Sequence, residues 1–334
     1  MGVAAVRQGA RSDMLDTTLL PPSWVQDFVG EAETKTATQQ DGMVLSVTAT
    51  QHATLASVRV PKAAELTGLF FQRRTIEAYN LIARKLRGRG GCHAVRFWNF
   101  IPNIRARVDH AFDRYMAFNA GRFAAFFDWL GSEEAFERLL AAGTGVGHDG
   151  RDLWVHALAT DRPGLPIHNP RQHRPYHYSS RYGPFPPCFA RATLLDRGPD
   201  RSAMVFVGGT ASVRGEESVH AGDLEAQTDE TFRNLREIIR AARVVTDHQL
   251  PIANWQSAIG NCEEKAARGD MAPLESFTAA RVYYLHSHQL DRIRASVDGR
   301  LAHLHNVEYV RADLCRPELL IEIEGTAILG AAAQ

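Results

Sequence analysis

Apolar residues in the second half of the chain recur with two different spacings. Between residues 224 and 245 they return every three or four positions, which predicts an amphipathic helix with Asp223 as a candidate N-cap. Short apolar runs at 188–195, 203–207, 277–285 and 319–328 predict strands, and a second helical pattern covers 290–304. An irregular stretch is expected around Pro251, Asn254 and Gly260. The pattern therefore predicts one α/β unit.

The first half repeats this order of elements with different residues. Its pattern predicts strands at 43–48, 55–60, 93–100 and 153–159, and helices at 63–86 and 108–129. The segments AYNLIARKL, HAVRFWNFIPNI and LWVHALA take the places of FRNLREIIR, AARVYYLHSHQL and IEIEGTA. A duplicated unit keeps its order of elements more strictly than its residues, so the chain is predicted to consist of two related units.

Domain boundaries follow from the repeat. We expect a loose, Gly/Ala-rich N-terminus at 1–40, a first domain at 41–160, a linker at 161–187 and a second domain at 188–330. The linker is rich in Pro, His, Tyr and Arg, whereas plain linkers favour small polar residues. Loops on a rigid scaffold often carry binding residues, so this segment is predicted to line a site.

Charge and composition argue against several classes of protein. The 38 Lys and Arg residues balance 38 Asp and Glu residues, which is unlike nucleic-acid or membrane-surface binders. No apolar run approaches the roughly 20 residues of a membrane helix, and the first residues lack the apolar stretch of a secretory signal. Cys92, Cys188, Cys262 and Cys315 are far apart in sequence, so reduced thiols in a cytoplasm are expected.

Motifs for metals, nucleotides and serine nucleophiles are missing. The chain has 14 histidines but no HExxH spacing, and His173 and His177 lie in a Pro-rich stretch that is a poor helix. No GxSxG motif occurs, and the GGTAS segment lacks the lysine and spacing of a nucleotide-binding loop. We therefore expect no metal site.

The segment VFVGGTASVRG has two interpretations. Gly208 and Gly209 follow a predicted strand and permit close approach of a ligand to the backbone, with the Thr210 and Ser212 hydroxyls nearby. The alternative is a tight turn before the helix that begins near Asp223, with no ligand involved.

The closing segment CRPELLIEIEG carries two acidic residues at strand spacing. Side chains alternate along a strand, so Glu322 and Glu324 share one face. Either both are solvated, or one points into a cleft and exchanges a proton with a substrate. Arg316 precedes them and could pair with a substrate carboxylate, while Cys315 is expected to be a small wall residue more than a nucleophile.

Further polar residues lie among apolar runs. Tyr182 and Arg191 belong to the rigid segment RYGPFPPCFARA, where Arg191 is either an edge residue or a charge placed for a ligand. In the first half the segments RFWNF and RYMAFNAGR contain Arg96, Asn99, Asn119 and Arg122. Such residues usually cap or pair locally, but several arginines near a domain interface would suit a dicarboxylate.

The second half resembles the RidA family of small trimeric α/β proteins, on the segments YGPFPPCFARA, FVGGTAS, RVYYL and IEIEG and on Gln227 with Asn234. The chain from about 44 to 329 resembles the chorismatases more specifically. That resemblance rests on VRFWNFIPNI, DRYMAFNAGR, GVGHDGRDLWVHALA, IHNPRQ, GTASVRG, HAGDLEAQ and ADLCRPELLIEIEG. It implies two RidA-like α/β units, packed as a pseudo-oligomer around one site between the domains.

The resemblance also implies an activity, namely cleavage of chorismate with release of pyruvate and without a cofactor. Glu322 would then be the proton donor and acceptor, and Cys315 the second residue of the catalytic pair. The implied substrate-binding residues are Arg191, Arg316, Arg122, Tyr182, Thr210 and Gln227. Trp154 and His156 take the places of Glu322 and Glu324 in the first unit, which implies one site per chain. Two fused units could imitate the trimeric RidA assembly internally, so a monomer is expected. Glu216 departs from the family, where a histidine is expected.

The product and two rival functions stay open. A cysteine before the closing strand, here Cys315, implies the branch that forms 3-hydroxybenzoate, whereas Ala211 could indicate the branch that forms a dihydroxycyclohexadiene carboxylate. The rivals are a RidA-like imine hydrolase and a non-catalytic ligand-binding module.

Overall fold

The structure is a computed structural model and describes residues 17–90, 92–108, 112–198, 202–248 and 274–330. The first half contains the elements η1 (Thr17–Leu19), α1 (Trp24–Val29), β1 (Thr34–Gln40), β2 (Met43–Ala49), β3 (Ala53–Val60), η2 (Ala63–Glu65), α2 (Gly68–Arg87), β4 (His93–Pro102), α3 (Arg114–Leu130), α4 (Phe136–Leu139), β5 (Ala142–His148) and β6 (Leu153–Thr160). The second half, with the segment that leads into it, contains β7 (Leu165–Ile167), η3 (Pro175–His177), η4 (Ser180–Tyr182), β8 (Ala192–Leu195), β9 (Ala203–Ala211), β10 (Val213–Arg214), β11 (Glu217–Ser218), α5 (Leu224–His248), η6 (Leu274–Ser276), β12 (Phe277–Tyr284), η7 (Ser287–Gln289), α8 (Leu290–Arg300), β13 (Val307–Arg311) and β14 (Ile321–Leu329).

Two six-stranded sheets repeat one topology. The first has the order β1-β2-β3-β6-β4-β5, and the second has the order β7-β8-β9-β14-β12-β13. In each, the third and fifth strands pair antiparallel with the fourth, and the fifth and sixth strands run parallel. The predicted α/β class with two related units is confirmed by this equivalence.

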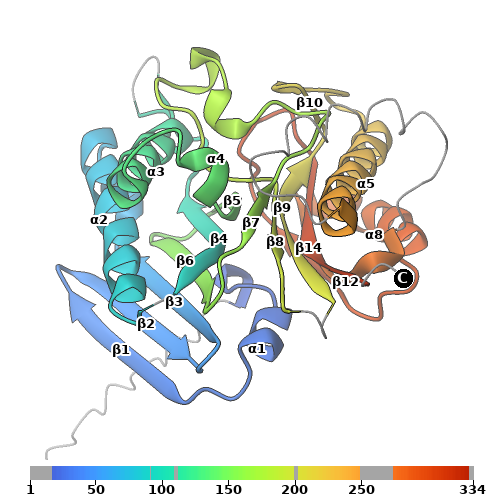
Figure 1. Cartoon of the computed structure of the whole chain (residues 1–334). Coiled ribbons are helices and arrows are strands. Elements are labelled where there is room, and N and C mark those ends of the chain that lie inside the picture. Colours follow the sequence, from blue (N-terminus) through green and yellow to red (C-terminus); the bar gives the residue numbers. More distant parts are fainter. Residues whose placement is uncertain (1–16, 91, 109–111, 199–201, 249–273, 331–334) are drawn as a thin grey trace, which may run out of the picture.

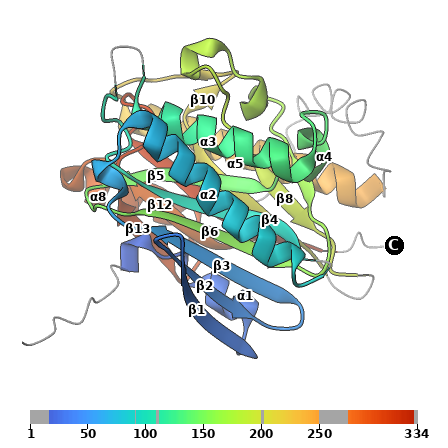
Figure 2. The ribbon, with the colours of Figure 1, turned by 90° about the vertical axis from the view of Figure 1, so that its left-hand side faces the viewer.

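Each sheet has helices on its outer face, and the two inner faces share a core. Figure 2 shows α2 and α3 side by side across the first sheet, and Figure 1 shows α5 and α8 beside the second. Buried Trp98, Phe100, Phe206 and Tyr283 belong to the cluster shared by the two sheets. Burial of these aromatic side chains gives the interface the character of a domain core.

The two halves also meet through backbone hydrogen bonds. Gly147 and Asp313 exchange N–H···O bonds of 2.6 and 3.1 Å, and the Ala190 amide donates to the carbonyl of Ala141 at 3.0 Å. As a result β5 and β9 lie next to one another, and Gly208 of β9 closely approaches Gly143 of β5. A Cβ atom at Gly208 would lie 2.8 Å from the carbonyl oxygen of Gly143. These contacts fix the geometry of the cavity described below.

The N-terminal segment differs from the expectation of a loose chain. Residues 1–16 lie outside the described residues, but α1 packs Trp24 and Phe28 on Phe206, and β1 pairs with β2. All seven residues of β1 are exposed polar or small residues, so no apolar alternation marks this edge strand in the sequence. Backbone pairing with the apolar strand β2 forms it.

Other boundaries also differ from the sequence pattern. Helix α3 begins at Arg114 instead of near residue 108, because the Asp113 carboxylate caps it by accepting from the Met116 amide at 2.8 Å. The strands β5 and β13 were not predicted: β5 is rich in glycine, and β13 is short. The capping role of Asp223 is confirmed, since its carboxylate accepts from the Ala226 amide. The irregular stretch around 251–260 lies outside the described residues.

None of the helices in the described ranges combines the length and the apolar character needed to cross a membrane.

Candidate active site

A cavity of about 200 Å³ lies where the two halves meet. Helix α3 and strand β5 line it from the first half, strands β9 and β14 line it from the second, and residues 178–191 cover it. The cavity is therefore built by segments from most of the chain, in agreement with the expectation of one site between the units. It brings together six of the eight candidate residues, namely Glu322, Cys315, Arg122, Arg191, Arg316 and Tyr182.

Glu322 is the acidic residue of β14 that faces the cavity. Its side chain is buried, and within the described part of the chain no hydrogen bond or ion pair engages its carboxyl group. Burial raises the pKa of Glu322 to about 8, the Glu324 charge adds to this rise, and the charges of Arg96, Arg191 and Arg316 oppose it. At neutral pH the carboxyl group is therefore protonated and can donate a proton.

Gly209 leaves the space that the Glu322 carboxyl group occupies. A Cβ at this position would lie 1.9 Å from Glu322 Oε1 and 3.3 Å from Thr144 Oγ1. Gly208 and Gly209 lie within β9 and not in a tight turn, and both approach other parts of the chain, Gly208 the backbone of β5 and Gly209 the Glu322 carboxyl group. The close approach of a ligand to this backbone stays a prediction.

The substitution Gly209→Ala is expected to displace Glu322 without unfolding the protein. The methyl group cannot share the space of the carboxyl oxygen, and a misplacement of about 1 Å costs on the order of 10²-fold in rate. Turnover should fall by about that factor, measured together with the thermal midpoint. A variant with unchanged turnover would show that Glu322 acts from another position.

Three buried arginines surround the same space. Arg122, Arg191 and Arg316 are 2%, 6% and 9% exposed, and none forms an ion pair with a carboxylate of the described residues. The Nε atoms of Arg122 and Arg191 are buried without a hydrogen-bond partner in this part of the chain. Buried charges normally require a counter-charge, so the cavity is suited to a ligand with more than one anionic group.

Hydrogen bonds hold these arginines in place. Arg316 Nη1 donates to the carbonyl of Glu216 at 2.6 Å and to Ser218 Oγ at 3.1 Å, and its guanidinium lies 4.0 Å from the centre of the Tyr182 ring. Arg191 Nη2 donates to the Tyr178 hydroxyl at 2.6 Å and to the carbonyl of His173 at 3.2 Å. Their remaining N–H groups are available for a ligand.

The segment before β8 supplies aromatic walls that were not individually predicted. Tyr178 and Phe189 line the cavity with Tyr182, and Tyr115 of α3 lines it from the other half. The unusual content of Tyr, His and Arg in the linker was the signal for Tyr178. No comparable signal in the sequence singled out Tyr115.

Two candidate residues need correction, because Thr210 and Gln227 do not line the cavity. Side chains alternate along β9, so Gly209 and Ala211 face the cavity while Thr210 points away and donates to the carbonyl of Gly208. Gln227 is fully buried in α5, where it donates to the carbonyl of Glu318 and accepts from the Leu320 amide. Gln227 therefore fixes the turn before β14.

Cys315 lies in the wall of the cavity and is partly buried. Burial, followed by the charge of Glu322, raises the pKa of the Cys315 thiol to about 12. The thiol stays protonated at neutral pH, so it is a poor nucleophile. Its position agrees with the expectation of a small wall residue.

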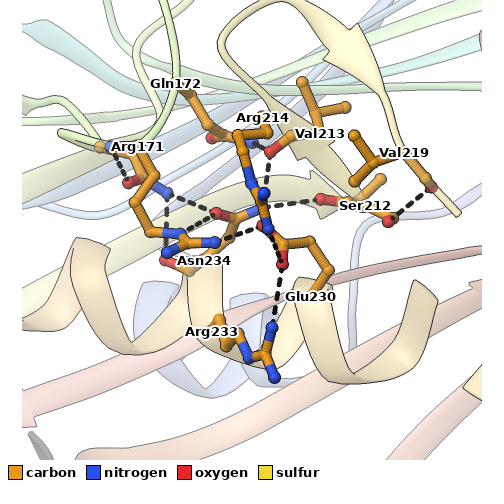
Figure 3. A network of polar contacts seen from close by, with 11 residues as sticks. Arg171, Gln172, Ser212, Val213, Arg214, Val219, Glu230, Arg233 and Asn234 are labelled. Carbon is orange, nitrogen blue, oxygen red and sulfur yellow. Dashed lines mark hydrogen bonds and ion pairs between the residues drawn. The ribbon is translucent and has the colours of Figure 1, made fainter. Parts of the chain in front are cut away.

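A polar network joins the linker and the β10–β11 hairpin to α5 (Figure 3). Glu230 is fully buried in α5 and accepts hydrogen bonds from Arg171, Arg214 and Arg233, while the Asn234 amide donates to the carbonyls of Ala211 and Val213. The network thus ties the linker and the β10–β11 hairpin to the end of β9. Burial alone would raise the pKa of Glu230, but the bonds and charges of Arg171 and Arg214 outweigh it and hold that pKa below its usual value.

The substitution Glu230→Gln is expected to destabilise the fold at neutral pH by about 1–3 kcal/mol, because charge-assisted hydrogen bonds are lost. A depressed pKa contributes stability that is present above the unfolded-state value, about 4.3, and is lost as the pH falls through the folded-state value. Denaturant unfolding of both proteins over a pH series measures this. The gap between wild type and variant should close towards acidic pH, and a constant gap would contradict this account.

Among the residues that the structure describes, no group of three or more His, Cys, Asp or Glu side chains could hold a metal ion.

Comparisons of sequence and of structure both find similarity to chorismatases. A family model described as "Chorismatase FkbO/Hyg5-like, N-terminal" matches residues 28–159. A 3-hydroxybenzoate synthase from Streptomyces hygroscopicus is 32% identical over 276 residues, which cover 81% of this chain and 72% of the relative. A chorismatase from the same organism is 29% identical over 252 residues, which cover 75% of this chain and 66% of the relative. The crystal structure of a chorismatase superposes with a TM-score of 0.69 and 26% identity, covering 87% of this chain and 78% of that one.

Proposed function

The chain belongs to the chorismatase family, and from this premise we propose that it cleaves chorismate to pyruvate and 3-hydroxybenzoate. One observation carries the proposal. The buried carboxyl group of Glu322, whose pKa burial raises to about 8, faces a cavity that also holds three buried arginines without a carboxylate partner among the described residues. This combination provides one proton for transfer and positive charge for an anionic substrate.

Chorismate matches these groups because it carries two carboxylates. One is attached to the cyclohexadiene ring, and the other belongs to the enolpyruvyl ether. We assign Arg191 and Arg316 to carboxylate binding, with Arg122 of α3 as a third cation in the cavity wall. An arginine can bind a carboxylate through two parallel N–H···O bonds, which fixes orientation as well as charge. The Tyr182 ring stacks on Arg316 and keeps it directed towards the cavity.

The reaction begins with transfer of the Glu322 proton to the methylene carbon of the enol ether. A new C–H bond forms, and the ether-bearing carbon becomes oxocarbenium-like. Glu322 is then a carboxylate and can take a proton back as the ring product forms, which restores the starting state. A carboxyl group whose pKa lies near the working pH is suited to both roles.

The atoms balance without a further reactant in the 3-hydroxybenzoate branch. Chorismate contains the same atoms as pyruvate and 3-hydroxybenzoate together. The ring hydroxyl oxygen attacks the neighbouring ring carbon and gives its proton to the Glu322 carboxylate, while the bond from that carbon to the ether oxygen breaks and the ether oxygen leaves as the keto oxygen of pyruvate. The resulting epoxide opens at the carbon that carried the hydroxyl, and a proton moves from the other epoxide carbon to the oxygen, which gives the aromatic ring. In the alternative branch one water is consumed, and the ring leaves as a dihydroxycyclohexadiene carboxylate. Both branches share the first proton transfer.

The choice between the branches rests on the wall of the cavity. Cys315 lies in that wall, and Ala211 pairs with Glu322 across β9 and β14. The relative with 32% identity is named a 3-hydroxybenzoate synthase, which supports the aromatic product for this chain. We propose that the neutral Cys315 thiol keeps water from the oxocarbenium-like carbon.

The proposal extends to assembly, because one chain contributes every residue assigned to the site. We therefore propose that a monomer is sufficient for activity. A cytoplasmic location stays a prediction.

The proposal is tested with chelator-treated protein and chorismate, with pyruvate followed in a coupled assay and the ring product identified by chromatography. We expect pyruvate and 3-hydroxybenzoate in equal amounts. Pyruvate with a dihydrodiol would overturn the role of Cys315 and retain the class. No pyruvate above the uncatalysed background would overturn the function. Imino acid turnover would then indicate an imine hydrolase, and chorismate binding without turnover would indicate a binding module.

A further inference from the structure

Glu324, the second acidic residue of β14, is saturated with hydrogen bonds and does not line the cavity. One carboxylate oxygen accepts from Trp98 Nε1 at 3.1 Å and from the Tyr283 hydroxyl at 2.9 Å, and the other accepts from Arg96 Nη2 and Thr144 Oγ1. The carboxylate is 1% exposed. These four donors, one of them the guanidinium of Arg96 in a buried ion pair, hold the Glu324 carboxylate in one position.

Glu322 and Glu324 meet around Gly209 and Thr144. The Gly209 amide donates to Thr144 Oγ1 at 3.0 Å, Thr144 Oγ1 donates to Glu324, and the Glu322 carboxyl oxygen occupies the space beside the Gly209 Cα. The two carboxyl groups therefore share neighbours, but the hydrogen-bond donors around them all donate to Glu324. Both sheets contribute to this arrangement, because Arg96, Trp98 and Thr144 come from the first half.

We propose that Glu324 is a positioning residue whose fixed negative charge keeps Glu322 protonated in the free enzyme. The proposal rests on the proposed function, in which Glu322 gives its proton to the substrate. Two like charges in a low-dielectric site disfavour each other, so an anion fixed at Glu324 opposes ionisation of Glu322. The first half of the chain thus contributes to catalysis by holding Glu324.

Other charged and titratable groups also act on Glu322, and they come from both halves of the chain. The groups that face it are Glu324 of β14, Arg96 of β4, Arg122 and Tyr115 of α3, Tyr283 of β12, Arg191 before β8, and Cys315 and Arg316 before β14. The arginines favour ionisation of Glu322 and stay charged throughout the working range. Burial raises the pKa values of Tyr115, Tyr283 and Cys315, so these groups remain neutral there. Burial and Glu324 are therefore the two features that raise the pKa of Glu322 at working pH.

The test is the pH dependence of kcat/KM for pyruvate release, which reports groups of the free enzyme. In the wild type the alkaline limb should have its midpoint near 8, where Glu322 loses its proton. The substitution Glu324→Gln removes the neighbouring negative charge and leaves Arg96 without its partner, so both changes favour ionised Glu322. The midpoint should fall by about one pH unit or more. Well below the new midpoint, kcat/KM should approach the wild-type value.

The single variant leaves a buried guanidinium unpaired and could fail to fold. The double variant Arg96→Gln/Glu324→Gln removes both charges and retains groups that can hydrogen-bond. Because Glu324 acts on Glu322 more strongly than Arg96 does, the midpoint should still move down, by less than in the single variant. Glu308→Gln is the matched control, since it removes a carboxylate paired with the buried Arg281 outside the cavity. Its midpoint should equal that of the wild type.

The possible results of this experiment distinguish a failure of the role proposed for Glu324 from a failure of the proposed chorismate cleavage. A purely structural role of Glu324 would lower kcat/KM equally at every pH and leave the midpoint in place, which would overturn the inference. Wild-type turnover with no alkaline limb near 8 would also overturn it. Absence of pyruvate release by the wild type would instead overturn the proposed function.

Discussion

Glu322→Gln is expected to lower kcat/KM for pyruvate release by about 10²–10⁴-fold, the usual contribution of a positioned proton donor. Glutamine keeps the shape of the side chain but cannot give a proton to the methylene carbon of the enol ether. Because no hydrogen bond or ion pair within the described residues engages the Glu322 carboxyl group, its replacement breaks no polar interaction among them. The thermal midpoint should therefore stay at the wild-type value or rise.

Glu318→Gln is the matched control for this loss. Glu318 also lies in the cavity wall, but it contributes its backbone carbonyl to Gln227 and is not assigned a proton transfer. Its kcat/KM should stay close to that of the wild type. If Glu322→Gln retains normal turnover, or if both variants lose activity equally, Glu322 is not the proton donor.

Arg191→Ala is expected to have the second largest effect, mainly on KM. Removal of a buried charge partner costs about 2–5 kcal/mol, which corresponds to about 30- to 4,000-fold in binding. The loss falls on ground-state and transition-state binding alike, since the carboxylate bound by Arg191 takes no part in bond breaking, so kcat should change much less than KM.

Arg191→Lys distinguishes charge from geometry. Lysine keeps the positive charge but loses the planar fork that binds a carboxylate through two bonds, and it cannot reproduce the bonds to Tyr178 and His173 together. Its KM should lie between those of the wild type and Arg191→Ala. A variant that loses kcat while KM stays unchanged would contradict the role of Arg191 in substrate binding. Circular dichroism of both variants controls for local unfolding.

Much of the architecture could be predicted, because hydrophobic spacing repeats in the two halves. The helices α2 and α5 and the strands β4, β6, β12 and β14 produce strong local patterns, so their places and their order are evident. Strand β1 has no apolar face, and α1 is short, so their formation depends on contacts with β2 and Phe206 that no local pattern indicates.

The candidate site could be predicted only in part, because sequence spacing does not fix which side of a strand faces a cavity. On β9 the side chains alternate, so Gly209 and Ala211 line the cavity, whereas Thr210 was the residue expected to bind the substrate. On β14 both acidic residues are buried, and only the contacts from Arg96, Trp98 and Thr144 assign the fixed charge to Glu324. These contacts join residues more than 170 positions apart, so they required the structure.

The most direct test of the account is the isotopic content of pyruvate formed from chorismate in D₂O. The Glu322 carboxyl proton exchanges with solvent, so its transfer to the methylene carbon should give pyruvate with one deuterium in the methyl group. Immediate reduction to lactate prevents later exchange, and pyruvate incubated with the Glu322→Gln variant serves as the control. One deuterium per pyruvate, formed at the enzymatic rate, is the predicted result. Pyruvate without deuterium would contradict proton donation by Glu322.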